Sequence, residues 1–93
     1  MQIEKREVEA SLPSKGFVRD NSGDHIYFHF MYDGKTTGIH TYVSHGARSI
    51  GDPLISAMKK QLHLNSSRDL VDLVKCPMSG EVYVQILKEK GQL

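Results

Sequence analysis

The sequence predicts an α+β fold in which helices cover one face of a three-stranded antiparallel sheet, in the order α-β-β-β-α, followed by a C-terminal helical extension. Two observations carry this prediction. The segment from Phe17 to Tyr42 is rich in β-branched and aromatic residues, and the dipeptide Asp33-Gly34 within it is a strong signal for a two-residue hairpin turn. The segments on either side have apolar residues at the three- and four-residue spacing of amphipathic helices.

The length and composition of the chain fit one cooperatively folded unit. Ninety-three residues cannot form two separate cores and still offset the conformational entropy that is lost on folding. Hydrophobic residues make up 39% and charged residues 25%, a balance that excludes wholesale disorder. Because the formal net charge is only +1, any binding of nucleic acid must depend on a local patch.

The sequence also predicts where the protein resides. No apolar run approaches the roughly 18 residues that cross a bilayer, and the N-terminal residues lack the apolar segment of a signal peptide. Cys76 is the only cysteine, so it has no partner for an intramolecular disulfide and makes a structural zinc site improbable. We therefore expect a cytoplasmic protein without contact with a membrane and without a cofactor.

The N-terminal elements follow from local signals. Residues 4–12 are good helix formers with apolar side chains four positions apart, which predicts a short helix. We expect Pro13 to end it, because proline lacks the amide hydrogen that a helix interior needs. Residues 14–16 then turn the chain into a first strand at residues 17–19.

The central hairpin fixes a register and therefore two faces. Strands are expected at residues 25–32 and 35–43, joined by Asp33 and Gly34 as the two loop residues. Side chains alternate between the faces of a sheet, so one set should face the core and the other should not. The predicted core pairs are Tyr32 with Lys35, Phe30 with Thr37, Phe28 with Ile39 and Ile26 with Thr41. The opposite, more polar face carries His25, Tyr27, His29 and Met31 beside Thr36, Gly38, His40 and Tyr42.

Three further helices are expected at residues 52–62, 67–75 and 79–90. The first should begin with Asp52 as its cap and Pro53 as its first helical residue, and its apolar stripe should lie against the inner face of the sheet. Ser67 and Ser79 are predicted to cap the other two. The apolar residues of these last two helices can complete the core, cover the open sheet face or form a dimer surface; they are Val71, Leu73, Val74, Val82, Ile86 and Leu87.

Five short strings resemble, in order and spacing, the HicA (YcfA-like) family. They are Lys15-Gly16-Phe17, Gly23-Asp24-His25, Asp33-Gly34, Ser44-His45-Gly46 and Lys60-Gln61-Leu62. The resemblance implies a double-stranded-RNA-binding-like domain over residues 1–64, with residues 65–93 as an extension packed on it. It also implies a toxin that acts as an mRNA interferase, that is, an endoribonuclease, neutralised by a HicB-like antitoxin.

The same resemblance implies a role for individual residues. His25 matches the catalytic histidine of the family, whereas Asp24 stands where the family usually has serine. Metal-independent RNA cleavage needs a base for the ribose 2′-hydroxyl proton and an acid for the leaving oxygen, and histidine can serve as either near neutral pH. His40 or His29 is the expected second proton carrier. The predicted register puts His40 opposite Tyr27 and therefore diagonal to both His25 and His29. The expected RNA contacts are Lys15, Lys35, Lys59 and Lys60 at phosphates and Tyr27 and Tyr42 on bases.

Plainer interpretations stand beside these. Each histidine can be a tolerated polar residue, and each lysine a solvated charge. A metal site is not expected, because the predicted register sets His25 and His29 about 13 Å apart and no carboxylate or thiolate was identified on that face. Cys76 is interpreted as structural. Two functional alternatives also remain: a non-catalytic module of the same fold that binds RNA or protein, and a homodimer in which the C-terminal helices occupy the sheet face.

Overall fold

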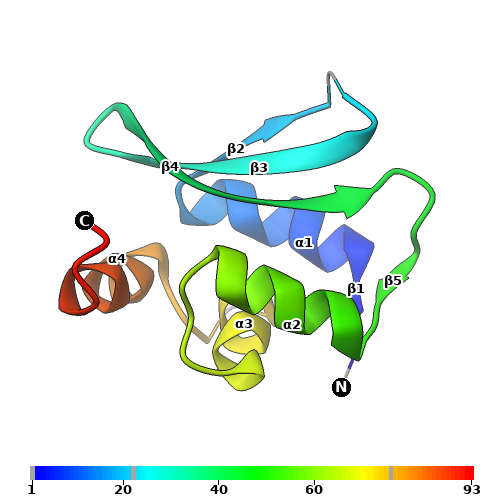
Figure 1. Cartoon of the computed structure of the whole chain (residues 1–93). Coiled ribbons are helices and arrows are strands. Elements are labelled where there is room, and N and C mark those ends of the chain that lie inside the picture. Colours follow the sequence, from blue (N-terminus) through cyan, green and yellow to red (C-terminus); the bar gives the residue numbers. More distant parts are fainter. Residues whose placement is uncertain (1, 22, 76) are drawn as a thin grey trace.

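A computed structural model shows two layers, a three-stranded antiparallel sheet and a layer of helices (Figure 1). It describes residues 2–21, 23–75 and 77–93. The sheet contains β2 (Phe17–Asp20), β3 (His25–Tyr32) and β4 (Lys35–Ser44) in that order. The four α-helices of the described residues lie on one side of it, and the other side is left open (Figure 1). The predicted α+β class and three-stranded sheet are confirmed.

The N-terminal helix differs from its prediction at both ends. Helix α1 (Lys5–Ser11) begins after Glu4, which caps it in a reciprocal arrangement: the Glu4 amide donates to Glu7 Oε1 at 3.0 Å. The α-helix ends at Ser11, before Pro13 as expected, but the chain continues as a 3-10 helix, η1 (Leu12–Lys15), which tolerates proline in its first turn. Gly16 then leaves this helix at φ +101°, as a glycine can.

A second, smaller sheet was not predicted. Strand β1 (Ile3–Glu4) pairs with β5 (Ser49–Ile50) in an antiparallel ladder of two residue pairs. Ile3 and Ile50 face each other in this ladder, and both are fully buried. Strands this short carry no periodicity, so the sequence offered no signal for them.

The central hairpin turns where the sequence predicts. Asp33 and Gly34 have φ values of +53° and +74°, the two positive values that a type I′ turn requires. Tyr32 pairs with Lys35 as expected. Met31 also pairs with Thr36 as the predicted register implies, but beyond that pair the register is wrong, because Phe28 pairs with Thr41 rather than Ile39.

A bulge causes this shift. Between the pairs His29–His40 and Met31–Thr36, β3 has one residue and β4 has three, Thr37, Gly38 and Ile39. Gly38 has φ +80°, and Thr37 Oγ1 donates to the Phe30 carbonyl at 2.8 Å, which fills part of the interrupted ladder. Since two extra residues are an even number, every side chain beyond the bulge keeps its predicted face.

The remaining helices complete the core beneath the sheet. They are α2 (Asp52–Gln61), α3 (Ser67–Lys75) and α4 (Gly80–Glu89). Tyr83 of α4 is fully buried, with ring centroids 5.0 Å from Phe30 and 5.7 Å from Phe17, and its hydroxyl donates to the Leu62 carbonyl at 2.9 Å. Of the three expected roles for the last two helices, completion of the core is therefore the one observed.

Three details of these helices correct the sequence interpretation. Gly51, not Asp52, is the cap of α2, so Asp52 is its first helical residue. Ser66, not Ser67, accepts the Asp69 amide at 3.2 Å, whereas Ser79 caps α4 as predicted, accepting from the Val82 amide. Val82 was assigned to packing but is 49% exposed, because the side of α4 that meets the sheet is centred on Tyr83 and Leu87.

Within the described ranges, no helix combines the length and the apolar character that crossing a bilayer requires.

Candidate functional site

The candidate site is the uncovered side of the three-stranded sheet, called the open face below. Alternation along β3 and β4 brings the predicted histidines and tyrosines to this side, half-buried or exposed, and β2 adds two neighbours that were not predicted. Val18 pairs with His29 and is 53% exposed, and Asp20 pairs with Tyr27. The open face comprises Val18, Asp20, His25, Tyr27, His29, Met31, Thr36, His40 and Tyr42.

The rings of the open face form one connected array. Tyr27 lies at its centre, with ring centroids 5.5 Å from Tyr42, 6.0 Å from His29 and 6.4 Å from His40. His25 closes one end of the array, 4.9 Å from Tyr42 in an edge-on arrangement. Contacts of this length and tilt are typical of aromatic pairs, so the array is a continuous platform of π surfaces.

The bulge in β4 determines which histidines meet. His40 was predicted to lie opposite Tyr27, but it pairs with His29, and the two imidazole centroids are 5.6 Å apart. The predicted register missed this pair. A signal was available, because an isolated glycine inside a strand often marks a bulge, and Gly38 occupies the bulge.

The same bulge orients the His40 ring. Its Nδ1 lies 3.1 Å from the carbonyl oxygen of Gly38, an oxygen that can only accept, so Nδ1 carries the hydrogen. In the neutral ring, Nε2 then has the free lone pair. His40 is exposed, so this nitrogen is available to a proton, a hydroxyl group or a metal ion.

His25 lies apart from this pair. It is the first residue of β3 and pairs with Ser44, and in the described part of the chain no ring contact joins it directly to His29 or His40. Tyr27 stands between, 6.2 Å from His25 and 6.0 Å from His29. The three histidines therefore share one surface, with tyrosine rings separating His25 from the other two.

The predicted phosphate-binding lysines are not on this surface. Lys15 lies in η1, where its ammonium donates to the carbonyls of Leu73, at 2.7 Å, and Met78. Lys35 sits beside the hairpin turn on the side that alternation assigns to the helices. Lys59 and Lys60 belong to α2, in the helical layer. As defined above, the open face contains no lysine or arginine.

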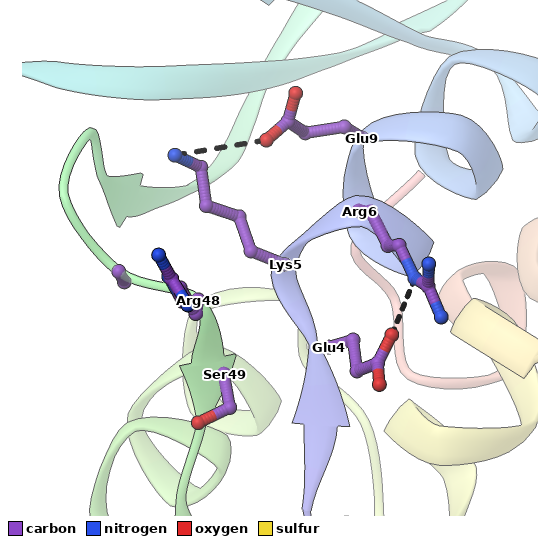
Figure 2. A pocket seen from close by; sticks show the side chains of 7 residues that line it. Glu4, Lys5, Arg6, Glu9, Arg48 and Ser49 are labelled. Atoms are coloured by element: carbon purple, nitrogen blue, oxygen red, sulfur yellow. Dashed lines mark hydrogen bonds and ion pairs between the residues drawn. The ribbon is translucent and has the colours of Figure 1, made fainter.

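A charged pocket of about 530 Å³ lies between α1 and the segment that leads into β5 (Figure 2). Most of its charges are paired: Arg6 with Glu4, Lys5 with Glu9 at 3.7 Å. Lys5 also joins the two walls, since its amide donates to the Arg48 carbonyl at 3.0 Å and its ammonium to the His45 carbonyl. These contacts fasten α1 to the end of β4, which is a structural role.

The described residues contain no cluster of three or more histidine, cysteine, aspartate or glutamate side chains arranged to hold a metal ion. The interpretation of Cys76 as structural lies outside those residues. Burial raises the pKa of the Tyr83 phenol above its ordinary value of 10.0. Tyr83 lies in the core and supports the sheet from beneath.

No protein-family model, curated protein or solved structure gives a significant match to this chain. The resemblance to the HicA family therefore stays a prediction.

Proposed function

We propose that the protein binds single-stranded RNA on the open face. The observation that carries this proposal is the connected array of tyrosine and histidine rings on a sheet face that no described helix covers. Unpaired bases stack on such rings, and each stacked base is worth about 1 to 3 kcal/mol. Tyr27 and Tyr42 are the central platform, consistent with the base contacts expected from the sequence.

The charge of the open face limits the kind of binding. A general nucleic-acid binder needs several cations along the phosphates, and this surface has none among its defining residues. Binding should therefore depend on stacking more than on counterion release, and its affinity should fall only weakly with salt. Duplex RNA, whose bases are already stacked on one another, should bind less well.

Competition between short fluorescent RNA strands tests this proposal. Tyr27→Ala and Tyr42→Ala should each weaken binding of a single-stranded RNA of mixed sequence roughly 5- to 150-fold. Tyr32→Ala is the matched control, because Tyr32 is also exposed but lies outside the open face, with Lys88 5.4 Å above its ring. Equal losses in all three variants, or a wild-type chain that binds no RNA, would contradict the proposal.

Cleavage of the bound strand is a second proposal, favoured by the lone pair of His40 Nε2 and by the family role of His25. In this reaction a neutral imidazole takes the proton of the ribose 2′-hydroxyl, whose oxygen attacks the adjacent phosphorus. The bond to the 5′ oxygen breaks, and a protonated imidazole gives that oxygen a proton, leaving a 2′,3′-cyclic phosphate and a free 5′-hydroxyl. His25 is proposed as one proton carrier, with His40, or His29 beside it, as the other.

Cleavage is tested separately from binding. RNA incubated with the protein in excess chelator should yield 2′,3′-cyclic ends, and His25→Ala should reduce the rate by about 10²- to 10⁴-fold while leaving most of the affinity. His63→Asn is the control, because His63 follows α2 at φ +59°, a conformation that asparagine accepts. If the wild-type chain binds RNA but yields no cyclic ends, the protein is the non-catalytic module and the role of His25 is refuted.

A further inference from the structure

We propose that His29 and His40 form a two-histidine site for a single divalent transition-metal ion of the zinc type, such as Zn²⁺, Ni²⁺ or Cu²⁺. Imidazole nitrogen is a ligand that these ions share, whereas Mg²⁺ and Ca²⁺ prefer oxygen. Ion binding here does not require RNA, although the site lies on the same surface and a bound ion would occupy the His40 lone pair that the proposed cleavage uses. Solvent would supply the remaining ligands, because the described residues offer no third histidine, cysteine, aspartate or glutamate placed to hold the ion.

The geometry of the pair fits one ion. Zinc–nitrogen bonds of roughly 2.0 to 2.1 Å at a tetrahedral angle put the centroids of two bound imidazole rings about 5 Å apart. The observed separation is 5.6 Å, with the ring planes 31° apart. A small rotation about the side-chain torsions closes the difference without any change in the backbone.

The backbone holds the two histidines in place. They are directly paired across adjacent strands, where side chains on one face are nearest neighbours. The pair borders the bulge, but both residues belong to strands that a packed core supports, which restricts their relative movement more than a loop would. By contrast, no ring contact joins His25 to either of them in the described residues, so the pair rather than the whole array is the site.

The hydrogen bond of His40 adds an independent observation. Metal-bound histidines usually donate their second ring nitrogen to a carbonyl or carboxylate, which fixes the tautomer and the ring orientation. His40 Nδ1 already makes this contact, at 3.1 Å from the Gly38 carbonyl, and so presents Nε2 outward. For His29, no hydrogen bond occupies a ring nitrogen within the described ranges, so it needs no bond broken before it binds.

Calorimetric titration of the full chain with Zn²⁺ alone tests the site. We expect one ion per chain and, since even outer-shell partners change metal affinity 10- to 100-fold, at least a tenfold weaker affinity in both His29→Ala and His40→Ala. His45→Ala and His63→Asn are the controls and should bind as the wild type does, because His45 contacts Gly23 from a loop and His63 lies in the helical layer. No binding by the wild type, or undiminished binding by His29→Ala or His40→Ala, overturns the proposal.

A second measurement guards against misfolded variants. Added Zn²⁺ should raise the Tm of the wild type and of the two controls but not that of His29→Ala or His40→Ala. Without the ion, all five proteins should melt at similar temperatures, because the replaced side chains lie outside the core. Nuclear magnetic resonance of the wild-type imidazoles should show shifts at His29 and His40 on addition of Zn²⁺, and shifts confined to His25, His45 or His63 would refute the assignment.

Discussion

The two faces of the three-stranded sheet are built from the same strands but differ in chemistry. On the inner face, Ile26, Phe28 and Phe30 are at most 2% exposed and pack on the helices. On the open face, the intervening Tyr27 and His29 remain half-buried and touch mainly other rings. Strand alternation therefore places stability and the proposed RNA binding on different faces: one set of residues packs in the core, and the next residue along each strand faces the uncovered side.

Truncation of two adjacent residues should show the largest difference in stability between the two faces. Phe28→Ala should destabilise the fold by about 3 to 5 kcal/mol, because it opens a cavity under a fully buried ring. Tyr27→Ala should cost only about 1 kcal/mol, since its ring is half-buried and its removal opens no cavity in the core. Urea unfolding followed by circular dichroism measures both. If the two variants lost similar stability, the open face would be part of the core and the division would fail.

A smaller effect on the inner side should come from Tyr83→Phe, which removes the donor to the Leu62 carbonyl. We expect a loss of about 1 to 3 kcal/mol at neutral pH, the cost of leaving a buried acceptor without its partner.

The same substitution should change the response to alkali. Burial raises the pKa of the Tyr83 phenol, so above pH 10 the unfolded chain releases a proton that the folded chain keeps. The wild type should therefore lose stability with rising pH more steeply than Tyr83→Phe, by about 1.4 kcal/mol for each pH unit beyond that point. Parallel slopes for the two proteins in urea unfolding from pH 9 to 11.5 would show that Tyr83 ionises as freely as an exposed phenol.

A smaller loss of stability than in Phe28→Ala or Tyr83→Phe is expected at the bulge that shapes the open face. Gly38→Ala should cost about 1 to 2 kcal/mol, because a side chain at φ +80° is strained although space is open around it. Gly46→Ala is the matched control, since Gly46 also has open surroundings but no positive φ. Comparison of their urea midpoints, together with the His29 and His40 imidazole signals, measures the change. Equal midpoints and unchanged signals would mean that the bulge does not depend on glycine.

Much of the fold could be predicted from local chemistry. The turn at Asp33 and Gly34 needs two positive φ values, and few residue pairs accept both, so its position was unambiguous. Face assignment followed from alternation and survived the bulge because two residues were added rather than one. The open face, with its histidines and tyrosines, was therefore found correctly although most pairs of the register were wrong.

The errors have a common cause, namely contacts between residues distant in the sequence. The pairing of Ile3 with Ile50 depends on two short segments meeting at the edge of the core. The choice of Tyr83 over Val82 as the buried residue depends on where α4 docks under Phe17 and Phe30. Lys15 lies away from the histidines because its ammonium donates to the carbonyl of Leu73, which is 58 residues later in the sequence.

The anchoring of Lys15 has a consequence for how the chain can be divided. Its ammonium is held by two main-chain oxygens of the C-terminal part, and Gly80 packs so closely on its backbone that an added Cβ would lie 3.0 Å from the Lys15 oxygen. The helices after residue 64 are thus attached to the N-terminal part of the chain by contacts of Lys15. A fragment lacking these helices would lose the Lys15 contacts and expose the rings of Phe17 and Phe30, which pack on Tyr83. Acylation of Lys15 would remove the ammonium that makes the same contacts, so it should loosen the C-terminal helices without changing the open face.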